Sequence, residues 1–306
     1  MAVRRPAVAG TFYPAQPAVL EQLVDQLLAD AGTSGTSRVP HTDPLRADSP
    51  PTEYSGPNPS RTASPAATAP IRLGAWSVIA PHAGYVHSGS TAAVAYRHLR
   101  RDGIERVAVL GPTHRVPLRG VATSSASAWS TPLGEARAIV PPSVAALPQV
   151  VVSDEAHAPE HSIEVHVPFL QRLLPQADLV PLAVGRATPS EVADVVDALL
   201  DDPATVVVIS SDLSHYLPYD AARRLDRDTI DQVTALRGDL DHEQACGATP
   251  INGLMEHARR RGGTIRALAS CSSGDTAGDR DRVVGYAALA LEEKAFEETA
   301  FVEAGP

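Results

Sequence analysis

The sequence has few aromatic residues and only two cysteines. Phe, Trp and Tyr make up 4% of the 306 residues, so a core has to be filled mainly by Ala, Val and Leu. Small aliphatic side chains of this kind suit a sheet that is covered by helices. Two cysteines, Cys246 and Cys271, are too few for a disulfide framework in a chain of this length.

The sequence also lacks a basic excess and a long apolar run. Its formal net charge is −10 at pH 7, whereas a nucleic-acid binder needs a basic stripe that neutralises phosphates. No run approaches the ~20 apolar residues of a membrane span, and residues 1–10 lack the apolar stretch of a signal peptide. We therefore expect a cytoplasmic protein with no nucleic-acid partner and no membrane partner.

One segment differs in composition from the rest of the chain. Of the 39 residues at 32–70, 23 are Pro, Ser, Thr or Gly. Such a segment buries too little apolar area to offset the entropy of ordering it. We predict a single domain over residues 1–306 with a disordered surface insertion at about 32–70; a docking tail is the alternative interpretation.

Outside this segment, β-rich and helical patterns alternate. Apolar, β-rich runs predict strands at residues 76–80, 106–110, 179–184, 205–209, 264–269 and 283–289. Helical periodicity predicts helices at residues 18–29, 90–100, 163–174, 189–200, 221–237 and 250–261. Alternation of this kind predicts an α/β fold, with a mostly parallel or mixed central sheet and helices on both faces.

Histidines follow three of the predicted strands. His82, His114 and His215 each come within six residues of a predicted strand end. In open α/β sheets, ligand sites lie outside the carboxyl ends of the strands. One histidine in such a place is more often a capping or solvated residue, but three at equivalent positions predict a shared site.

Seven motifs resemble those of the Memo family. They are residues 3–14 (VRRPAVAGTFYP), 81–89 (PHAGYVHSG), 111–114 (GPTH), 160–170 (EHSIEVHVPFL), 210–215 (SSDLSH), 245–247 (ACG) and 281–289 (DRVVGYAAL). The motifs keep the family's order and are spread over nearly the whole chain, and the insertion at 32–70 is the main departure. The resemblance implies a fold similar to that of the class III extradiol dioxygenases.

The resemblance also implies a metal site. Class III extradiol dioxygenases hold Fe(II) with two histidines and a glutamate, and a further histidine acts as acid and base. Carried over to this sequence, His82 and His114 become the imidazole ligands and Cys246 takes the place of the carboxylate. His215 takes the position of the acid/base histidine, and Asp212 precedes it by one turn.

The residue types suit these implied roles. Neutral imidazole is a common protein ligand for iron, copper and zinc. A Cys246 thiolate makes the ligand set softer than two histidines with a carboxylate, and it makes the site redox-sensitive. We expect one divalent or redox metal ion, Fe(II) or copper first and zinc as the alternative. A buried structural thiol is the competing interpretation for Cys246 and the preferred one for Cys271.

Several polar residues are candidates for work beside the metal. If Ser211 or Asp212 caps a short helical turn, Asp212 would orient His215 and stabilise its imidazolium; a plain helix cap is the alternative. Residues expected to contact substrate are Tyr85, His87, His161 and Glu164, the last two facing one pocket. The other histidines are expected to point outward or to be solvated: His41, His98, His157, His166, His242 and His257.

These features predict a metal-dependent redox or dioxygenase-like protein that acts on a small, unidentified substrate. The alternative is a non-catalytic module that holds a metal or a peptide in the same pocket. Prokaryotic Memo proteins are associated with a radical-SAM protein, so the resemblance implies such a partner. A zinc hydrolase is weaker, because the sequence has neither an HExxH motif nor a nucleophile elbow. Asp212 and His215 together favour the enzyme.

Overall fold

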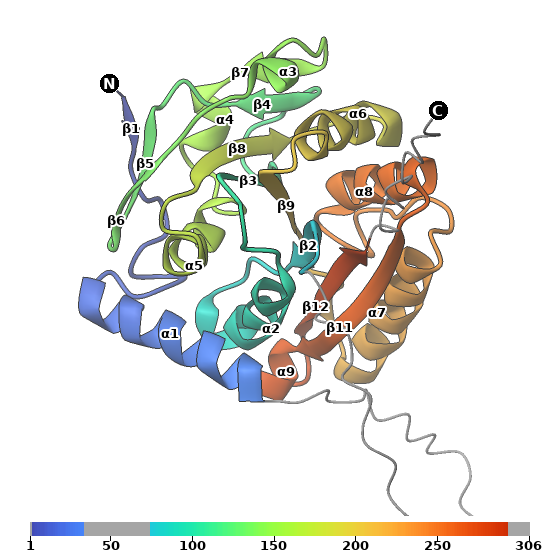
Figure 1. Ribbon diagram of the computed structural model, residues 1–306. Helices are drawn as coiled ribbons and strands as arrows, with labels where there is room; N and C mark the ends of the chain where they lie inside the picture. The colour runs from blue at the N-terminus through green and yellow to red at the C-terminus, as the bar shows by residue number, and fades with distance from the viewer. Residues whose placement is uncertain (1, 34–73, 293–306) are drawn as a thin grey trace, which may run out of the picture.

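A computed structural model describes residues 2–33 and 74–292 (Figure 1). All six predicted strands and all six predicted helices are present, with bounds that differ by a few residues. The predicted insertion lies outside the described residues from residue 34 onward, and the assignment of residues 1–306 to one domain stays a prediction. None of the helices among the described residues is long and apolar enough to cross a membrane.

Two sheets and ten helical elements make up this part of the chain. The larger sheet contains β2 (Ser77–Ala80), β3 (Arg106–Pro112), β4 (Val121–Thr123), β7 (Val150–Val152), β8 (Asp178–Val184), β9 (Thr205–Ser210), β10 (His215–Leu217), β11 (Thr264–Ser272) and β12 (Val283–Glu292). The smaller sheet contains β1 (Val3–Arg4), β5 (Ala128–Thr131) and β6 (Gly134–Arg137). The helical elements are α1 (Pro17–Thr33), α2 (Tyr85–His98), α3 (Pro142–Ala145), α4 (Asp154–His157), the 3₁₀ turn η1 (Glu164–His166), α5 (Val167–Leu173), α6 (Pro189–Leu200), α7 (Tyr219–Thr234), α8 (Ala248–Arg261) and α9 (Ser273–Thr276).

The larger sheet is mixed. Its centre is parallel, in the order β2-β9-β3-β8. On one side β12 runs antiparallel to β2, β10 and β11, and on the other side β4 runs antiparallel to β8. The predicted mixed α/β sheet is therefore confirmed, with a parallel core that brings several strand ends to one edge.

Alternation along the central strands assigns each apolar side chain to one face. In β9, Val206 and Val208 pack in a core with residues of α1, α2 and α5. Their neighbours Val207 and Ile209 pack in a second core with residues of α6 and α8. Successive side chains of a strand point to opposite faces, so the sheet is buried on both sides, as Figure 1 shows. The predicted placement of helices on both faces is confirmed.

Candidate metal centre

Three parallel neighbours, β2, β9 and β3, end at the same edge of the sheet. The chain leaves β2 through His82, leaves β3 through His114, and leaves β9 through Asp212. Ligand sites of α/β sheets lie at this edge because the loops there can aim side chains at a common point. His82 and His114, which follow two of these strands in the sequence, therefore lie in one region.

Cys246 reaches the same region from the turn that precedes α8. The next residue, Gly247, donates its N–H to the Ser211 hydroxyl at 2.9 Å. A Cβ atom at Gly247 would lie 2.5 Å from the carbonyl oxygen of Ser210, a distance that real side chains do not tolerate. Glycine is therefore needed for this turn to pack against the end of β9 and to bring the thiol to the site.

His82, His114 and Cys246 come together. One side-chain ligand atom from each lies within 4.8 Å of the other two. His82 Nε2 and Cys246 Sγ are 3.3 Å apart. The His82 and His114 rings lie edge to face with 5.2 Å between centroids. His82 is buried, whereas His114 and Cys246 are partly exposed, so the cluster has one accessible side.

Glu160 anchors His114, a role that the sequence analysis missed. One carboxylate oxygen of Glu160 accepts a hydrogen bond from the His114 backbone N–H at 2.6 Å, and the other contacts His114 Nδ1 at 2.9 Å. The second oxygen also accepts the backbone N–H groups of His161 and Ser162. Burial alone would raise the pKa of Glu160, but the bonds and charge of His114 bring it down to about 2. An ionised Glu160 holds the proton of His114 on Nδ1 and leaves Nε2 for a ligand.

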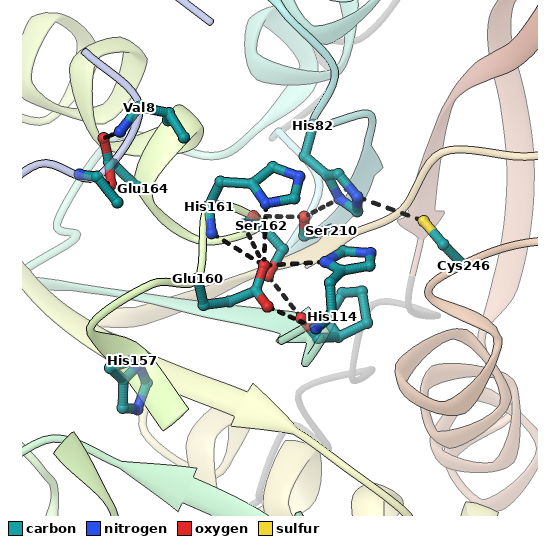
Figure 2. Close-up of polar contacts among 12 residues, drawn as sticks. Val8, His82, His114, His157, Glu160, His161, Ser162, Glu164, Ser210 and Cys246 are labelled. Carbon is teal, nitrogen blue, oxygen red and sulfur yellow. Dashed lines mark hydrogen bonds and ion pairs between the residues drawn. The ribbon is translucent and has the colours of Figure 1, made fainter. Parts of the chain in front are cut away.

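His161 lies inside the cluster, as Figure 2 shows. Its ring stacks on His114 at 4.9 Å between centroids and contacts Phe12 at 4.8 Å. Burial lowers the pKa of His161 to about 4, although the Glu160 charge opposes the shift. His161 is therefore a neutral ring at pH 7 that lines the site beside a proposed ligand. Glu160, His114 and His161 also form a second group whose ligand atoms lie within 4.8 Å of one another.

Glu164 does not share this pocket, so that expectation is wrong. Its carboxylate accepts hydrogen bonds from the backbone of Ala7 and Val8 at 2.7 and 3.0 Å and from the Tyr13 hydroxyl at 2.5 Å. It also forms an ion pair with Arg4. Figure 2 shows the carboxylate directed to Val8 and away from the histidines. The side chain that was predicted to bind substrate instead holds the N-terminal segment.

Tyr85 and His87 lie in the first turn of α2, a few residues after His82. The Tyr85 hydroxyl donates to the carbonyl of Val165 at 2.6 Å and is buried, so the phenol is engaged within the protein. His87 is half-buried, and its Nδ1 is a buried atom with no hydrogen-bond partner among the described residues. The predicted contact of His87 with a ligand stays a prediction.

The helical turn that both interpretations of Asp212 required is absent. Residues 211–214 have no regular secondary structure and His215 opens β10. Asp212 accepts the backbone N–H of His82 at 2.8 Å and that of Ala83, and the hydrogen bonds of the described residues include none between Asp212 and His215. The carboxylate therefore supports the loop that carries a proposed ligand and does not orient His215.

Three histidines that were expected outside are buried. His157, His166 and His257 are exposed by 0%, 1% and 1%. Each pairs with a group that no local pattern reveals: His157 with the Ala122 carbonyl, His166 with Ser210 and His257 with Asp197. The remaining three are divided: His98 and His242 are exposed, as expected, and His41 lies outside the described residues.

Comparisons with known proteins identify the family of this chain. A model of the family described as Memo-like protein matches residues 61–290. The chain belongs to the Memo-like family. MEMO1 family proteins of Methanopyrus kandleri and Methanothermobacter thermautotrophicus are each 34% identical to it, over 94% of this chain and 98% and 99% of theirs. A MEMO1 family protein of Sulfolobus acidocaldarius is 33% identical over 93% of this chain and 97% of its own.

A crystal structure of an uncharacterized protein of Escherichia coli K12 is also similar, with a TM-score of 0.46 and 14% identity. The match covers 70% of this chain and 98% of that chain. At this level the likeness adds nothing to the Memo-like family assignment.

Two acidic groups of this Memo-like site, Cys246 and Asp212, have raised pKa values. Burial, together with the nearby charge of Asp212, raises the pKa of the Cys246 thiol to about 12. Burial also raises the pKa of Asp212 to about 7, against the effect of its two backbone hydrogen bonds. Without a cation nearby, the thiol is therefore protonated at neutral pH. A cation bound here would have to displace that proton, because the thiolate is the ligand form of cysteine.

Proposed function

We propose that this Memo-like protein holds one metal ion between His82, His114 and Cys246 and acts as a metal-dependent redox protein on a small substrate. The observation that carries the proposal is the convergence of three ligand atoms from three separate loops within 4.8 Å. Two imidazoles and a thiol are ligands for iron, copper and zinc. The thiol favours copper among the redox metals, and Fe(II) and zinc are the other candidates.

The geometry of the cluster suits such an ion. For a tetrahedral zinc-like ion, bonds of about 2.0 Å to nitrogen and 2.3 Å to sulfur place the two ligand atoms roughly 3.5 Å apart. His82 Nε2 and Cys246 Sγ lie 3.3 Å apart. Glu160 would act on the ion through His114, as carboxylates beside ligating histidines do. Three protein ligands also leave coordination positions for a substrate.

The chain's own residues offer proton transfer beside that point. Burial lowers the pKa of His215. A hydrogen bond from one ring N–H to the Leu213 carbonyl opposes this shift but does not reverse it. His215 is thus a neutral base at pH 7. Asp212, with a pKa of about 7, can hold or release a proton near neutral pH. A bound redox metal would supply electron transfer, which none of these side chains provides.

A non-catalytic module that binds a metal or a peptide, working with a radical-SAM partner, is the second candidate. It uses the same three ligands and the same partly exposed side of the cluster. It does not need His215, since a binding module transfers no proton. The two candidates therefore differ in what His215 does and agree on the metal.

The test is a metal titration of the reduced, oxygen-free protein with Fe(II), Cu(I), Zn(II) and Co(II). We expect one equivalent of metal to bind. The affinity should fall by roughly 100-fold or more in His82→Ala, His114→Ala and Cys246→Ser, because losing a residue that only hydrogen-bonds to a ligand already lowers metal affinity by about 10–100-fold. The Co(II) protein should show a sulfur-to-cobalt absorption band that Cys246→Ser lacks. His215→Gln is the matched control and should bind metal like the wild type.

A wild-type protein that binds none of the four ions would overturn the proposal. If His215→Gln lost metal as severely as His82→Ala, His215 would be a ligand and the assignment of roles would be wrong. Oxygen uptake by the Fe(II)- or Cu(I)-loaded protein, with excess ascorbate as the electron donor, separates the two candidates. The enzyme predicts a rate that falls by roughly 10²–10⁴-fold in His215→Gln, whereas the binding module predicts no difference.

A further inference from the structure

A buried chain of hydrogen bonds runs from α2 to His82. The Tyr96 hydroxyl contacts His166 Nδ1. His166 Nε2 lies 2.8 Å from Ser210 Oγ, and Ser210 Oγ lies 2.7 Å from His82 Nδ1. The exposed fractions of Tyr96, His166, Ser210 and His82 are 0%, 1%, 0% and 2%. Water therefore does not compete for these bonds, and each polar atom depends on its partner in the chain.

The direction of every proton in this chain follows from Ser210. Its hydroxyl carries one proton and donates it to the Ser162 carbonyl at 2.6 Å, because a carbonyl oxygen only accepts. The two ring nitrogens in contact with Ser210 Oγ must then both be donors. His82 accordingly carries its proton on Nδ1, and His166 carries one on Nε2.

The far end of the chain is consistent with this assignment. Burial lowers the pKa of His166 to about 3, so its ring is neutral and has a single proton. With that proton on Nε2, the Nδ1 atom has a lone pair and accepts the hydroxyl proton of Tyr96. Tyr96, His166, Ser210 and His82 thus each have a partner of the right kind, and only one pattern of protons satisfies all of them.

We propose that Ser210 and His166 are positioning residues that hold His82 as its Nδ1–H tautomer and so direct the Nε2 lone pair to the point beside Cys246. The proposal rests on the metal centre proposed above for its purpose. The tautomer itself follows from hydrogen bonds that are present without any ion. His82 Nε2 lies 3.3 Å from Cys246 Sγ, so the free lone pair faces the thiol.

The two histidines of the centre are thus held in different ways. His114 bonds through Nδ1 to the carboxylate of Glu160 at 2.9 Å, whereas His82 bonds through Nδ1 to a neutral hydroxyl. Both arrangements present Nε2. Only Glu160 adds a negative charge, so Glu160 and the Cys246 thiolate together balance the charge of a divalent ion, and the chain from Tyr96 serves orientation alone.

The first experiment measures the ring tautomers in the metal-free, reduced wild-type protein at neutral pH by long-range proton–nitrogen NMR correlation. We expect Nδ1–H for His82 and Nε2–H for His166. In Ser210→Ala the Nε2–H form of His82 should appear. Ser77→Ala is the matched control, because Ser77 is a fully buried serine on the adjacent strand β2. A wild-type His82 with its proton on Nε2 would overturn the proposal without any variant.

The second experiment measures Co(II) and Zn(II) affinity. Ser210→Ala should bind roughly 10–100-fold more weakly, the usual cost of removing a group that orients a ligand. Ser210→Thr keeps the hydroxyl and should restore affinity, and Tyr96→Phe should have a smaller effect because His166 can still donate from Nε2. If Ser210→Ala bound metal like Ser77→Ala, the positioning role would be wrong. A wild type that binds no metal would overturn the metal centre, while the tautomers would still decide the hydrogen-bond assignment.

Discussion

At the scale of the residue, the two acids of one short motif serve different parts of the molecule. Glu160 bonds to His114 and belongs to the candidate metal centre. Glu164, four residues later, bonds to the N-terminal segment. Both are buried. Glu160 accepts from the neighbouring backbone of His161 and Ser162 as well as from the distant His114, whereas the donors to Glu164 all lie far away in the sequence. An acidic side chain in a motif therefore shows that a charge is needed, but the donors around it decide what the charge does.

Asp212 predicts how stability depends on pH. Its pKa of about 7 lies above the ordinary 3.8 because the group is buried. Between these two pH values the folded protein keeps the Asp212 proton and the unfolded chain has released it. The contribution of Asp212 to the free energy of unfolding is therefore fully present below about pH 4 and is lost as the pH rises to 7. The upper bound of this loss is roughly 4 kcal/mol. Asp212→Asn should be more stable than the wild type at pH 8.

The measurement is urea unfolding of the metal-free protein at several pH values from 4 to 8. The stability that Asp212→Asn gains over the wild type should grow as the pH rises from 4 to 7. Asp226, whose pKa burial raises to about 6, and His161 and His166, whose pKa values burial lowers to about 4 and about 3, affect both proteins alike. Asp154→Asn is the control, because hydrogen bonds from Ser125 and Ser124 lower the pKa of this exposed acid. A difference between the two proteins that stayed constant with pH would show that the pKa of Asp212 is not raised in the folded protein.

At the scale of the element, an irregularity in β10 determines where His215 lies. His215 pairs with Val284 and Leu217 pairs with Val283, so two steps along β10 match one along β12. The residue between them, Tyr216, has a φ of 59° and is 62% exposed. Bulges of this kind re-aim side chains beside active sites. The bulge separates a half-buried His215 from an exposed Tyr216.

The left-handed backbone at Tyr216 predicts an inverted preference among substitutions. Asn tolerates this conformation and a β-branched residue does not. The free energy of unfolding of Tyr216→Val should therefore be about 1–2 kcal/mol lower than that of Tyr216→Asn. Val152 is a control of similar exposure, 67%, on the regular edge strand β7. There Val152→Asn should instead cost stability, by up to ~1 kcal/mol. Equal stability of the two Tyr216 variants in urea would show that the bulge relaxes.

At the scale of the whole molecule, the N-terminal segment is tied to the middle of the chain. Arg4 pairs with Glu164 and donates to the carbonyl of His157 at 3.1 and 3.2 Å. The Arg4 guanidinium also lies 4.4 Å from the centre of the Trp129 ring. Strand β1 pairs with β5 in the smaller sheet. One buried carboxylate thus joins the first residues to the segment that also supplies His161.

Removing that carboxylate should destabilise the protein strongly. Glu164→Gln leaves the buried guanidinium of Arg4 without its counter-charge, and the expected loss is about 3–5 kcal/mol in the free energy of unfolding. Arg172→Gln is the matched control, because Arg172 forms ion pairs with Glu21 and Asp25 at the surface. Such pairs contribute up to ~1 kcal/mol. If the two variants lost similar amounts of unfolding free energy, the buried ion pair would contribute no more to stability than a surface pair.

Local pattern was sufficient for the longer strands and helices and for the edge where the candidate centre lies. The strands of the parallel core are apolar runs that local periodicity reveals, and the position of His82 and His114 just after strand ends follows from that register. The short strands β4, β5, β6 and β7, between residues 121 and 152, were missed because three or four residues are too few for a period to show. Their pairing is decided by neighbours across the sheet.

The partner of each polar side chain was decided only by the tertiary structure. The sequence by itself determined the alternating α/β order, the Memo-like motifs and the place of His82 and His114 just after strands, because these depend on residues near one another in the chain. It did not determine that Glu160 would hold His114, that His166 would be buried against Ser210, or that Glu164 would turn to the N-terminal segment. Those pairs join residues from 44 to 157 positions apart, and no local pattern encodes which buried donor meets which acceptor.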